Sequence, residues 1–308
     1  MSALGRMQQA LNEVVRGQDA AIADMLTAFL ARGHVLLEGV PGVAKTLLAR
    51  SVAQVLGLNT TRIQFTPDLM PTDEVGTSVF RPTYGTFHVV RGPVFTDVLI
   101  SDEINRTPPK TQAALLEAME ERQVSLDGTT HALSPFFFVV ATQNPIELEG
   151  TYPLPEAQLD RFLVRVKVGY PDIDSERAML EGFHARKGEK PSLQAVVSPQ
   201  ELRSLQSAAA TLPCDGTLFD YVLRLVRASR DDGRVRLGAS PRAAQSLLAA
   251  AKARAALTGQ AFVTPDDVKA CAPSVLGHRL LIKAEAEVEG LTADDVVRRL
   301  LDRVEVPR

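Results

Sequence analysis

One stretch, residues 34–57, constrains the fold more than any other. It reads HVLLEGVPGVAKTLLARSVAQVLG: an apolar run, a loop with two glycines, and then apolar residues at helical spacing. A strand, a short loop and a helix in direct succession form the first part of a βαβ unit, which belongs to a parallel sheet covered by helices. Gly57 is placed to end the helix as a C-terminal cap. The chain is therefore expected to contain an α/β domain.

Four more strand-like runs follow in the first half of the chain. Residues 97–101 and 136–142 are continuously apolar, like 34–38, which is typical of strands buried on both faces. Residues 62–65 and 162–168 alternate apolar with charged or polar residues, which fits strands at the edges of a sheet. We predict three central strands and two edge strands.

Past about residue 190 the strand pattern stops. Ser198-Pro199-Gln200-Glu201 combines a capping serine, a proline at the first helical position and a glutamate at the third, and Thr264-Pro265-Asp266-Asp267 repeats the device. Apolar residues between these two signals recur at helical spacing. We predict an α/β domain over 1–190 and an all-helical domain over 191–308, with the boundary in the polar stretch 185–193.

Composition excludes several classes of protein. A chain of 308 residues that is 45% apolar can bury a core, and a net charge of −3 gives no general attraction to nucleic acid. No apolar run reaches the roughly 20 residues of a membrane span, and the N-terminal stretch lacks the apolar core of a signal peptide. We expect a cytoplasmic protein. Its two cysteines, Cys214 and Cys271, are expected to be reduced, buried thiols.

The loop GVPGVAKT nearly matches the phosphate-binding signature G-x-x-x-x-G-K-[ST], but Ala44 stands where the second glycine belongs. Glycines let the backbone N–H groups converge on phosphate oxygens, and the helix N-terminus adds its dipole. Lys45 would meet the β- and γ-phosphates, and the Thr46 hydroxyl would bind Mg²⁺. The alternative is an ordinary turn between strand and helix. The candidate loop residues are Gly39, Val40, Pro41, Gly42, Val43, Ala44, Lys45, Thr46 and Leu47. Since alanine disfavours positive φ, we predict helical backbone at Ala44.

Polar residues follow two of the other apolar runs. Asp102 and Glu103 come directly after 97–101, and Asn144 comes just after 136–142. Ligands bind at the carboxyl ends of parallel strands, so these side chains should meet the glycine loop. Asp102 would complete the Mg²⁺ shell, Glu103 would deprotonate an attacking water, and Asn144 would hold the γ-phosphate or that water. The alternatives are a solvated acidic pair that caps the next helix and a plain Asn-Pro turn.

Taken together, these motifs resemble those of the AAA+ ATPases, and the whole chain resembles the MoxR group. GVPGVAKT is similar to Walker A, VLISDE to Walker B, and ATQNP to sensor 1, and MoxR-like sequences often carry AKT in place of GKT. The resemblance implies a P-loop core with a five-stranded parallel sheet of order 5-1-4-3-2 and a C-terminal all-α lid. It also implies ATP as substrate, Mg²⁺ as cofactor and a homo-oligomeric ring, usually a hexamer.

Further site residues come from the same resemblance. PEAQLDRF is similar to the segment with the arginine finger, here Arg161, which would act on the neighbouring subunit's nucleotide. An ion pair of Arg161 with Asp160 or Glu156 is the alternative. GASPRA is similar to sensor 2, here Arg242, in the first turn of a helix, where a cation is disfavoured without an anion nearby. Alternatively, the Arg242 side chain extends into solvent. The resemblance leaves open whether Arg242 acts on the nucleotide of its own subunit or of a neighbour. Gly17 and Gln18 match the segment that contacts adenine.

Two further stretches, 78–95 and 123–135, resemble the hairpin insertions of this group. Thr83-Tyr84-Gly85-Thr86 and Asp127-Gly128 are their expected turns. In a ring they would face the pore or the substrate; alternatively, Phe80, Tyr84 and Phe87 pack against their own subunit.

The expected function is ATP-driven, chaperone-like remodelling or maturation of a partner protein. MoxR-like proteins typically act with von Willebrand factor A domain proteins, and because this chain lacks the D-x-S-x-S motif, such a partner would be a separate polypeptide. The alternative is a nucleic-acid motor. The stretch 123–135 has no Lys or Arg to grip DNA, whereas Arg81 and Arg91 in the other insertion keep that alternative open. A transcription activator would need a G-A-F-T-G-A loop, which is absent. A non-hydrolysing scaffold would not need Glu103 and Arg161.

Overall fold

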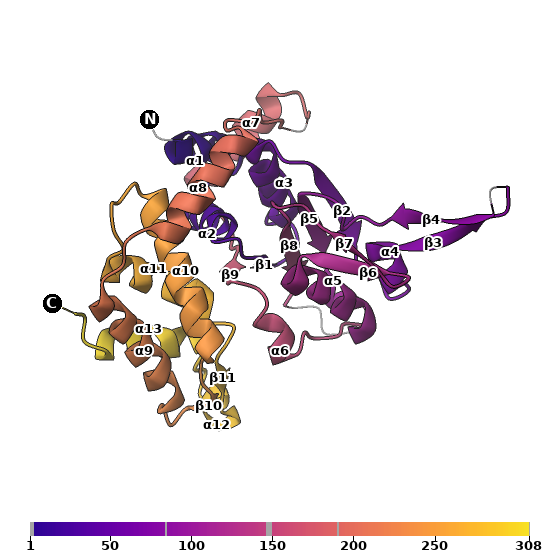
Figure 1. The fold of residues 1–308 in the computed structure, drawn as a ribbon. Helices are drawn as coiled ribbons and strands as arrows, with labels where there is room; N and C mark the ends of the chain where they lie inside the picture. Colours follow the sequence, from indigo (N-terminus) through magenta and orange to yellow (C-terminus); the bar gives the residue numbers. More distant parts are fainter. Residues whose placement is uncertain (1–2, 84, 146–149, 190, 308) are drawn as a thin grey trace.

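A computed structural model describes residues 3–83, 85–145, 150–189 and 191–307 (Figure 1). Its first half alternates strands with helices. In chain order the elements are α1 (Ala3–Val14), α2 (Asp19–Leu30), β1 (Val35–Glu38), α3 (Lys45–Leu56), β2 (Thr60–Gln64), α4 (Pro71–Val75), β3 (Gly76–Arg81), β4 (Thr86–Arg91), β5 (Val98–Asp102), the 3₁₀ turn η1 (Ile104–Arg106), α5 (Pro109–Glu121), β6 (Gln123–Leu126), β7 (Thr129–Ala132), β8 (Phe138–Gln143), α6 (Glu156–Leu159), β9 (Val164–Lys167) and α7 (Ile173–Ala185).

Five of these strands form one parallel sheet in the order β2-β5-β8-β1-β9. If these five strands are numbered 1 to 5 in chain order, they lie in the order 2-3-4-1-5. Read from the other edge, this is the predicted order 5-1-4-3-2, which is confirmed. The two alternating runs form the edge strands β2 and β9, and the three apolar runs form the centre, also as predicted. Because an edge strand is partly in contact with solvent, β2 and β9 can carry charged side chains within their length, namely Arg62, Arg165 and Lys167.

Each central strand buries alternate side chains on opposite faces of the sheet. In β8, Phe138 and Val140 belong to an apolar cluster that continues into the C-terminal helices, whereas Val139 and Ala141 belong to a second cluster that includes Leu115 of α5. Both faces are therefore covered, as expected for a parallel sheet.

The C-terminal part consists mainly of helices: α8 (Pro199–Thr211), α9 (Gly216–Arg230), α10 (Pro241–Leu257), α11 (Pro265–Leu276), α12 (Ala284–Val288) and α13 (Ala293–Arg303). Ser198 and Thr264 cap α8 and α11 in capping boxes, as predicted. The all-helical prediction is wrong in one detail, because β10 (Val235–Leu237) and β11 (Leu281–Ile282) form a short antiparallel ribbon. Strands of three and two residues are too short to produce a readable alternation in the sequence.

The C-terminal helices pack against the α/β part beside β9 and α2 (Figure 1). Their apolar cluster is continuous with the one on that face of the sheet. Polar contacts reinforce the junction: Gln206 of α8 donates to the carbonyl of Phe29 at 2.9 Å, and Asp294 accepts from Arg165 of β9 at 3.2 Å. The lid thus rests on the side of the sheet away from β2.

Two hairpins leave the core. β3 and β4 project away from the body of the protein (Figure 1), with the rings of Phe80 and Phe87 5.2 Å apart across the ribbon. Phe80 is 50% and Phe87 71% exposed, so the two rings contact each other but are not buried against the body of their own subunit. Tyr84 lies outside the described residues. β6 and β7 are joined by Asp127-Gly128, both at positive φ, which is the turn expected from the sequence.

Within the described part of the chain, no helix is long and apolar enough to cross a membrane. Cys271 is a buried free thiol, as predicted. Cys214 is a free thiol but only partly buried, so for that residue the predicted burial is wrong. It precedes Asp215, the N-cap of α9, at the surface between two helices.

Candidate active site

The glycine loop runs from the end of β1 to the start of α3. A Cβ atom on Gly39 would lie 2.4 Å from the carbonyl oxygen of Val168, so the close passage of the loop past the chain after β9 requires glycine. Gly42 has φ 88°, a value that glycine adopts without strain. The loop then enters α3 at Lys45, and this places the N-terminus of that helix at the carboxyl edge of the sheet.

Ala44 does not have the predicted helical backbone. Its φ of 64° and ψ of 27° are left-handed, and it forms the N-cap of α3. The prediction is wrong because the turn from loop to helix needs a left-handed residue at this position whichever side chain it carries. The loop therefore tolerates the cost of a left-handed alanine, roughly 1–2 kcal/mol.

The two polar residues that open α3 point in different directions. The Lys45 ammonium donates to the carbonyl oxygens of Gly39 and, at 3.0 Å, Val40, so it lies along the inside of the loop. The Thr46 hydroxyl lies 3.1 and 3.2 Å from the two carboxylate oxygens of Asp102 at the end of β5. The first helical turn thus connects the loop to the neighbouring strand end.

Asp102 is the buried centre of the site, with only 4% of its surface exposed. The Thr142 hydroxyl on β8 donates to its Oδ1 at 3.2 Å and accepts from the backbone N–H of Glu103 at 3.0 Å. On the other side, Nε of Arg62 on β2 lies 2.6 Å from Oδ2. Adjacent strands on both sides therefore fix the carboxylate.

Glu103 is the N-cap of η1 and has left-handed backbone, with φ 58°. Its Oε2 accepts from the Gln64 amide at 2.7 Å and lies 3.2 Å from Nε of Arg106. Left-handed backbone at a residue other than glycine is uncommon and concentrates at functional sites. Here it turns the chain so that the side chains of 102 and 103 both reach the carboxyl edge.

Arg62 and Gln64 are site residues that were not predicted, because their alternation with apolar residues indicates only an edge strand. Strand register pairs Gln64 with Asp102, so both polar side chains of β2 reach the same strand ends as the acidic pair. A signal was present in the sequence: residues two apart on a strand share a face, and these two follow each other at its carboxyl end.

The predicted loop residues from Pro41 to Leu47, except Val43, line one cavity of about 340 Å³ together with Asp102, Glu103 and Asn144, whereas the predicted loop residues Gly39 and Val40 do not line it. Loop, strand ends and helix start all contribute to it, and Asn144 is brought beside the acidic pair as predicted. Its lining residues are Pro41, Gly42, Ala44, Lys45, Thr46, Leu47, Arg62, Gln64, Asp102, Glu103, Thr142, Gln143 and Asn144.

A second cavity of about 210 Å³ adjoins the first and shares Gly42, Ala44 and Leu47 with it. Gln18 lines this second cavity, and its amide donates to the carbonyl of Gly169 at 2.9 Å. Gly17 precedes it with φ 68°. The loop therefore separates a polar cavity from a smaller, more apolar one, an arrangement with room for phosphates on one side and a base on the other.

Arg161 and Arg242 are not among the described residues that line either cavity. Arg242 does lie in the first turn of α10, behind the Ser240 cap, as the sequence indicates. Both arginines contact Glu120 of α5, at 3.0 Å for Arg161 and 2.9 Å for Arg242. The expected anion beside Arg242 is therefore a carboxylate of the same chain.

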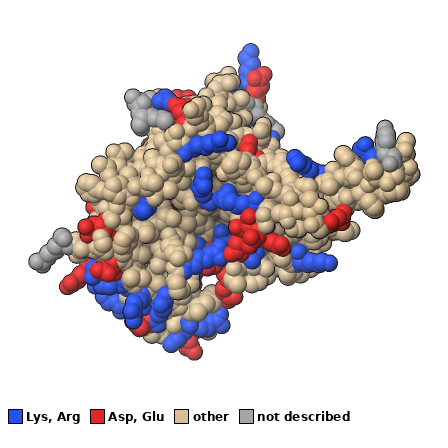
Figure 2. Space-filling view, in the orientation of Figure 1, with Lys and Arg blue, Asp and Glu red and all other residues tan. Residues whose placement is uncertain are grey.

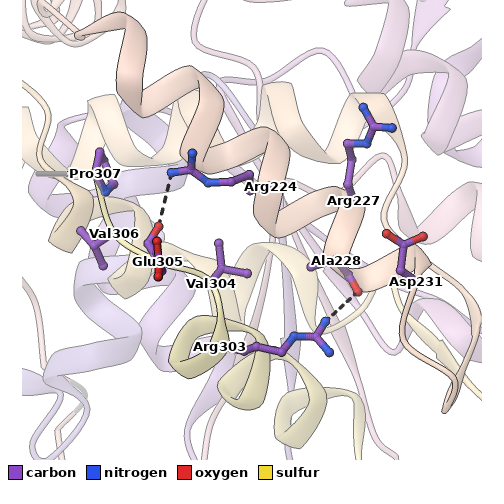
Figure 3. Close-up of a pocket in the computed structure, with 9 residues that line it drawn as sticks. All are labelled: Arg224, Arg227, Ala228, Asp231, Arg303, Val304, Glu305, Val306 and Pro307. Carbon is purple, nitrogen blue, oxygen red and sulfur yellow. Dashed lines mark hydrogen bonds between the residues drawn. The ribbon is translucent and has the colours of Figure 1, made fainter.

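A larger cavity, about 930 Å³, lies elsewhere, between α9 and the segment after α13 (Figure 3). Arg224 donates to the backbone carbonyl of Glu305, and Arg303 donates to that of Ala228 (Figure 3). These arginines connect the C-terminal segment to α9. The cavity is not adjacent to the strand ends, so its size does not make it the candidate active site.

The chemistry of the site fits Mg²⁺. Thr46 and Asp102 bring hydroxyl and carboxylate oxygens together, and Mg²⁺ prefers oxygen ligands. Over the described residues, no cluster of three or more His, Cys, Asp or Glu forms a complete metal site. Mg²⁺ at nucleotide sites takes one or two protein ligands together with phosphate oxygens and water.

Comparison with known proteins identifies the family. Residues 34–164 match the model of the ATPase family associated with various cellular activities (AAA), and residues 227–300 match the AAA lid domain. Chaperone MoxR1 of Mycobacterium tuberculosis is 44% identical over 314 residues, which cover 98% of this chain and 82% of MoxR1. The chain belongs to the MoxR family of AAA+ ATPases. The AAA core of this MoxR-type chain is the α/β part described above, and its lid is the C-terminal helical part.

Two more proteins are similar to this MoxR-type chain over nearly its whole length. The uncharacterized protein YeaC of Bacillus subtilis is 44% identical over 305 residues, which cover 99% of this chain and 95% of YeaC. A crystal structure of a protein from Cytophaga hutchinsonii, described as a candidate ATPase, has a TM-score of 0.91 at 37% identity and covers 99% of this chain and 95% of its own. The similarity therefore includes the lid and both hairpins.

Proposed function

We propose that this chain hydrolyses Mg²⁺-bound ATP in the cavity at the ends of β1, β5 and β8. Lys45 contacts the β- and γ-phosphates, while Thr46 and Asp102 hold the metal ion, which supplies charge neutralisation on the phosphates. Glu103 orients the attacking water and takes its proton. Asn144 holds the γ-phosphate or that water.

One observation carries this proposal: the ends of three parallel strands and the start of one helix bring Lys45, Thr46, Asp102, Glu103 and Asn144 to a single cavity of about 340 Å³. An ordinary turn after β1 would not need this set of side chains opposite it. A solvated acidic pair is also a poor account of Asp102, because that carboxylate is buried.

We also propose that the active form is a ring, with six subunits as the expected number, in which Arg161 acts on the neighbouring subunit's nucleotide. The position of Arg161 supports this, since its partly exposed side chain lies outside the cavity of its own subunit, beside Glu120. A monomer would lack this charge on the transferring phosphoryl group and hydrolyse ATP slowly.

The proposed role of hydrolysis is to remodel or mature a client protein in the cytoplasm, together with a separate von Willebrand factor A domain protein. The chaperone name of MoxR1 supports a role of this kind. We place the boundary between the nucleotide-binding domain (1–190) and the lid (191–308) within residues 185–193. The projecting β3–β4 ribbon, with its exposed Phe87, is the proposed contact for clients in the ring.

An ATPase assay against protein concentration tests the proposal. Wild type, Glu103→Gln and Glu117→Gln are compared, the last because Glu117 is an exposed glutamate of α5 outside the cavity. We expect turnover per subunit that rises with assembly, is lost in Glu103→Gln and is retained in Glu117→Gln. A Glu103→Gln variant that hydrolyses ATP like wild type would refute the assignment of the site.

Adding partners separates the two functional classes. A von Willebrand factor A domain protein should change the turnover, whereas single-stranded DNA should not. The sequence of β6 and β7 supports this expectation, because it contains no Lys or Arg. Stimulation of several-fold by DNA would favour the nucleic-acid motor instead.

A further inference from the structure

The Glu120 carboxylate lies between two arginines that come from distant parts of the chain. Its Oε2 is 3.0 Å from Nε of Arg161, and its Oε1 accepts from Nη1 of Arg242 at 2.9 Å. Glu120 belongs to the last turn of α5, Arg161 follows α6, and Arg242 belongs to the first turn of α10. Each carboxylate oxygen therefore holds one arginine, and the core and the lid meet at this glutamate.

Neither arginine uses up its hydrogen-bonding groups in this contact. Arg161 contacts Glu120 through Nε, and its two Nη groups donate no hydrogen bond to any other described residue. Arg242 is held through Nη1, with Nε 4.0 Å from Asp160, and its Nη2 likewise has no partner in the described part of the chain. The terminal nitrogens of guanidinium groups are the donors that bind phosphate oxygens in pairs.

All three side chains can be reached from solvent. The exposed fractions are 28% for Arg161, 46% for Arg242 and 36% for Glu120. On the face seen in Figure 2, basic and acidic side chains gather around a hollow between the α/β part and the lid. A phosphate of a neighbouring subunit can approach such a surface without unfolding any element.

The acidic neighbours of Arg161 are engaged elsewhere. Asp160 accepts from Nε of Arg279 at 2.6 Å, and Glu156 lies 3.6 Å from Nη2 of Arg236. Arg161 therefore does not form the ion pair with Asp160 or Glu156 that the sequence offered as an alternative. Its side chain is directed to Glu120 instead, although 41 positions separate the two residues in the chain.

Two guanidinium groups brought to one place repel each other, and an anion between them removes that repulsion. Glu120 supplies this charge before any nucleotide is present. Because its oxygens take one arginine each, the carboxylate fixes the distance between the arginines while leaving terminal donors of both available. Such prior positioning saves reorganisation when charge develops on a phosphoryl group.

We propose that Glu120 is a positioning residue that holds Arg161 and Arg242 as one unit, and that both arginines act on the same nucleotide, in the neighbouring subunit. This rests on the proposed function of the ring. The sequence leaves open whether Arg242 acts on the nucleotide of its own subunit or of a neighbour. Because one carboxylate joins Arg242 to Arg161, both arginines face the same neighbouring subunit.

Glu120→Gln, which keeps the shape and removes the charge, tests this role against Glu117→Gln one turn earlier on α5. We expect kcat to fall about tenfold in Glu120→Gln, with the KM for ATP and the affinity for a fluorescent ATP analogue changed less than about twofold. Glu120→Asp should recover part of the activity. Melting temperature and ring assembly, which a merely structural role would lower, should match those of Glu117→Gln.

A double-mutant cycle and a mixing experiment complete the test. Arg161→Ala should lower kcat by on the order of 10³-fold. Adding Glu120→Gln to Arg161→Ala should lower kcat by less than the tenfold expected in wild type, since the part of the Glu120 effect that acts through Arg161 is already lost. Mixing Arg242→Ala subunits with Glu103→Gln subunits should restore activity, because some interfaces then combine an intact Glu103 with a neighbour's intact Arg242.

The outcomes separate this inference from the proposed function. Should wild type fail to hydrolyse ATP, or Glu103→Gln match it, the proposed function and the inference both fall. If Glu103→Gln is inactive but Glu120→Gln behaves like Glu117→Gln, only the positioning role is refuted. A Glu120→Gln variant faster than wild type would show that Glu120 restrains the arginines instead, and absence of recovery in the mixed rings would overturn the shared nucleotide.

Discussion

Nε of Arg279 lies 2.6 Å from Oδ1 of Asp160, deep in the junction between lid and core, where the Arg279 side chain is only 3% exposed. The same guanidinium donates to the carbonyl oxygens of Phe162 at 2.7 Å and Leu163 at 3.0 Å. His278 beside it contacts the Phe162 carbonyl through Nε2, and burial together with the charge of Arg279 holds the pKa of this imidazole well below its usual range. The lid thereby holds the backbone that directly follows Arg161.

Arg279→Met should destabilise the protein by about 3 kcal/mol, because it leaves Asp160 and several buried carbonyl groups without their donor. Denaturant unfolding measures the loss. Arg298→Met is the matched control, since Arg298 is 69% exposed and its pair with Asp295 at i,i+3 is worth less than about 0.5 kcal/mol. Equal effects of the two substitutions would contradict the structural role of Arg279.

Much of the fold and of the site could be predicted because the determining signals are local. Whether a strand is continuously apolar or alternating depends on its own neighbours in the sheet, so 62–65 and 162–168 were correctly placed at the edges. Side chains directly after a parallel strand must reach its carboxyl edge, and this is why Asp102 and Asn144 were found.

The rest depends on contacts between distant segments. No periodicity in α5 marks Glu120 as the partner of Arg161 and Arg242, and nothing in the lid sequence marks Arg279 as buried. Ala44 shows a different limit: residue preference predicts the φ that an alanine favours, whereas the path of the loop imposes the φ that it has. At Ala44, the path of the loop between β1 and α3 determines the backbone conformation, against the preference of alanine for negative φ.

Ala44→Gly tests that constraint. Glycine adopts φ near 64° without strain, so the substitution should stabilise the protein, by up to about 1 kcal/mol after the entropy gained by the unfolded chain is subtracted. Ala113→Gly, at an exposed position inside α5, should instead destabilise it by roughly 0.5–1 kcal/mol. Thermal unfolding of both variants decides the matter, and a loss of stability in Ala44→Gly would show that the alanine contributes packing that outweighs the strain.

Arg62→Gln should strengthen Mg²⁺ binding. Arg62 lies 2.6 Å from the Asp102 carboxylate and competes with the metal ion for it. Half-exposed ion pairs are worth up to about 1 kcal/mol, so the Mg²⁺ concentration for half-maximal nucleotide binding should fall by up to about fivefold. Arg50→Gln, at an exposed position on α3, should leave it unchanged. If Arg62→Gln raises that concentration, Arg62 supports nucleotide binding directly instead of competing with the metal.

Glu74 is a buried acid at the base of the β3–β4 ribbon. It is 1% exposed, and neither of its carboxylate oxygens has a hydrogen-bond partner within the described residues. Burial, with a smaller contribution from the charge of Asp73, raises the pKa of Glu74 to about 8, from an ordinary value of 4.5. The folded state therefore keeps a proton that the unfolded state releases between these two pH values.

This difference fixes the sign of the pH dependence. Stability from the protonated Glu74 is fully present below pH 4.5, falls as the pH rises, and is lost once the pH passes about 8. Glu74→Gln stays neutral throughout, so relative to wild type it should gain stability between pH 5 and pH 8, by roughly 3 kcal/mol at about 1.4 kcal/mol per unit of pKa less some local relaxation. Unfolding free energies at several pH values, with Glu117→Gln as the control, measure the gain. Profiles of wild type and Glu74→Gln that run parallel would mean that the carboxyl group titrates normally, and that water reaches it at the base of the ribbon.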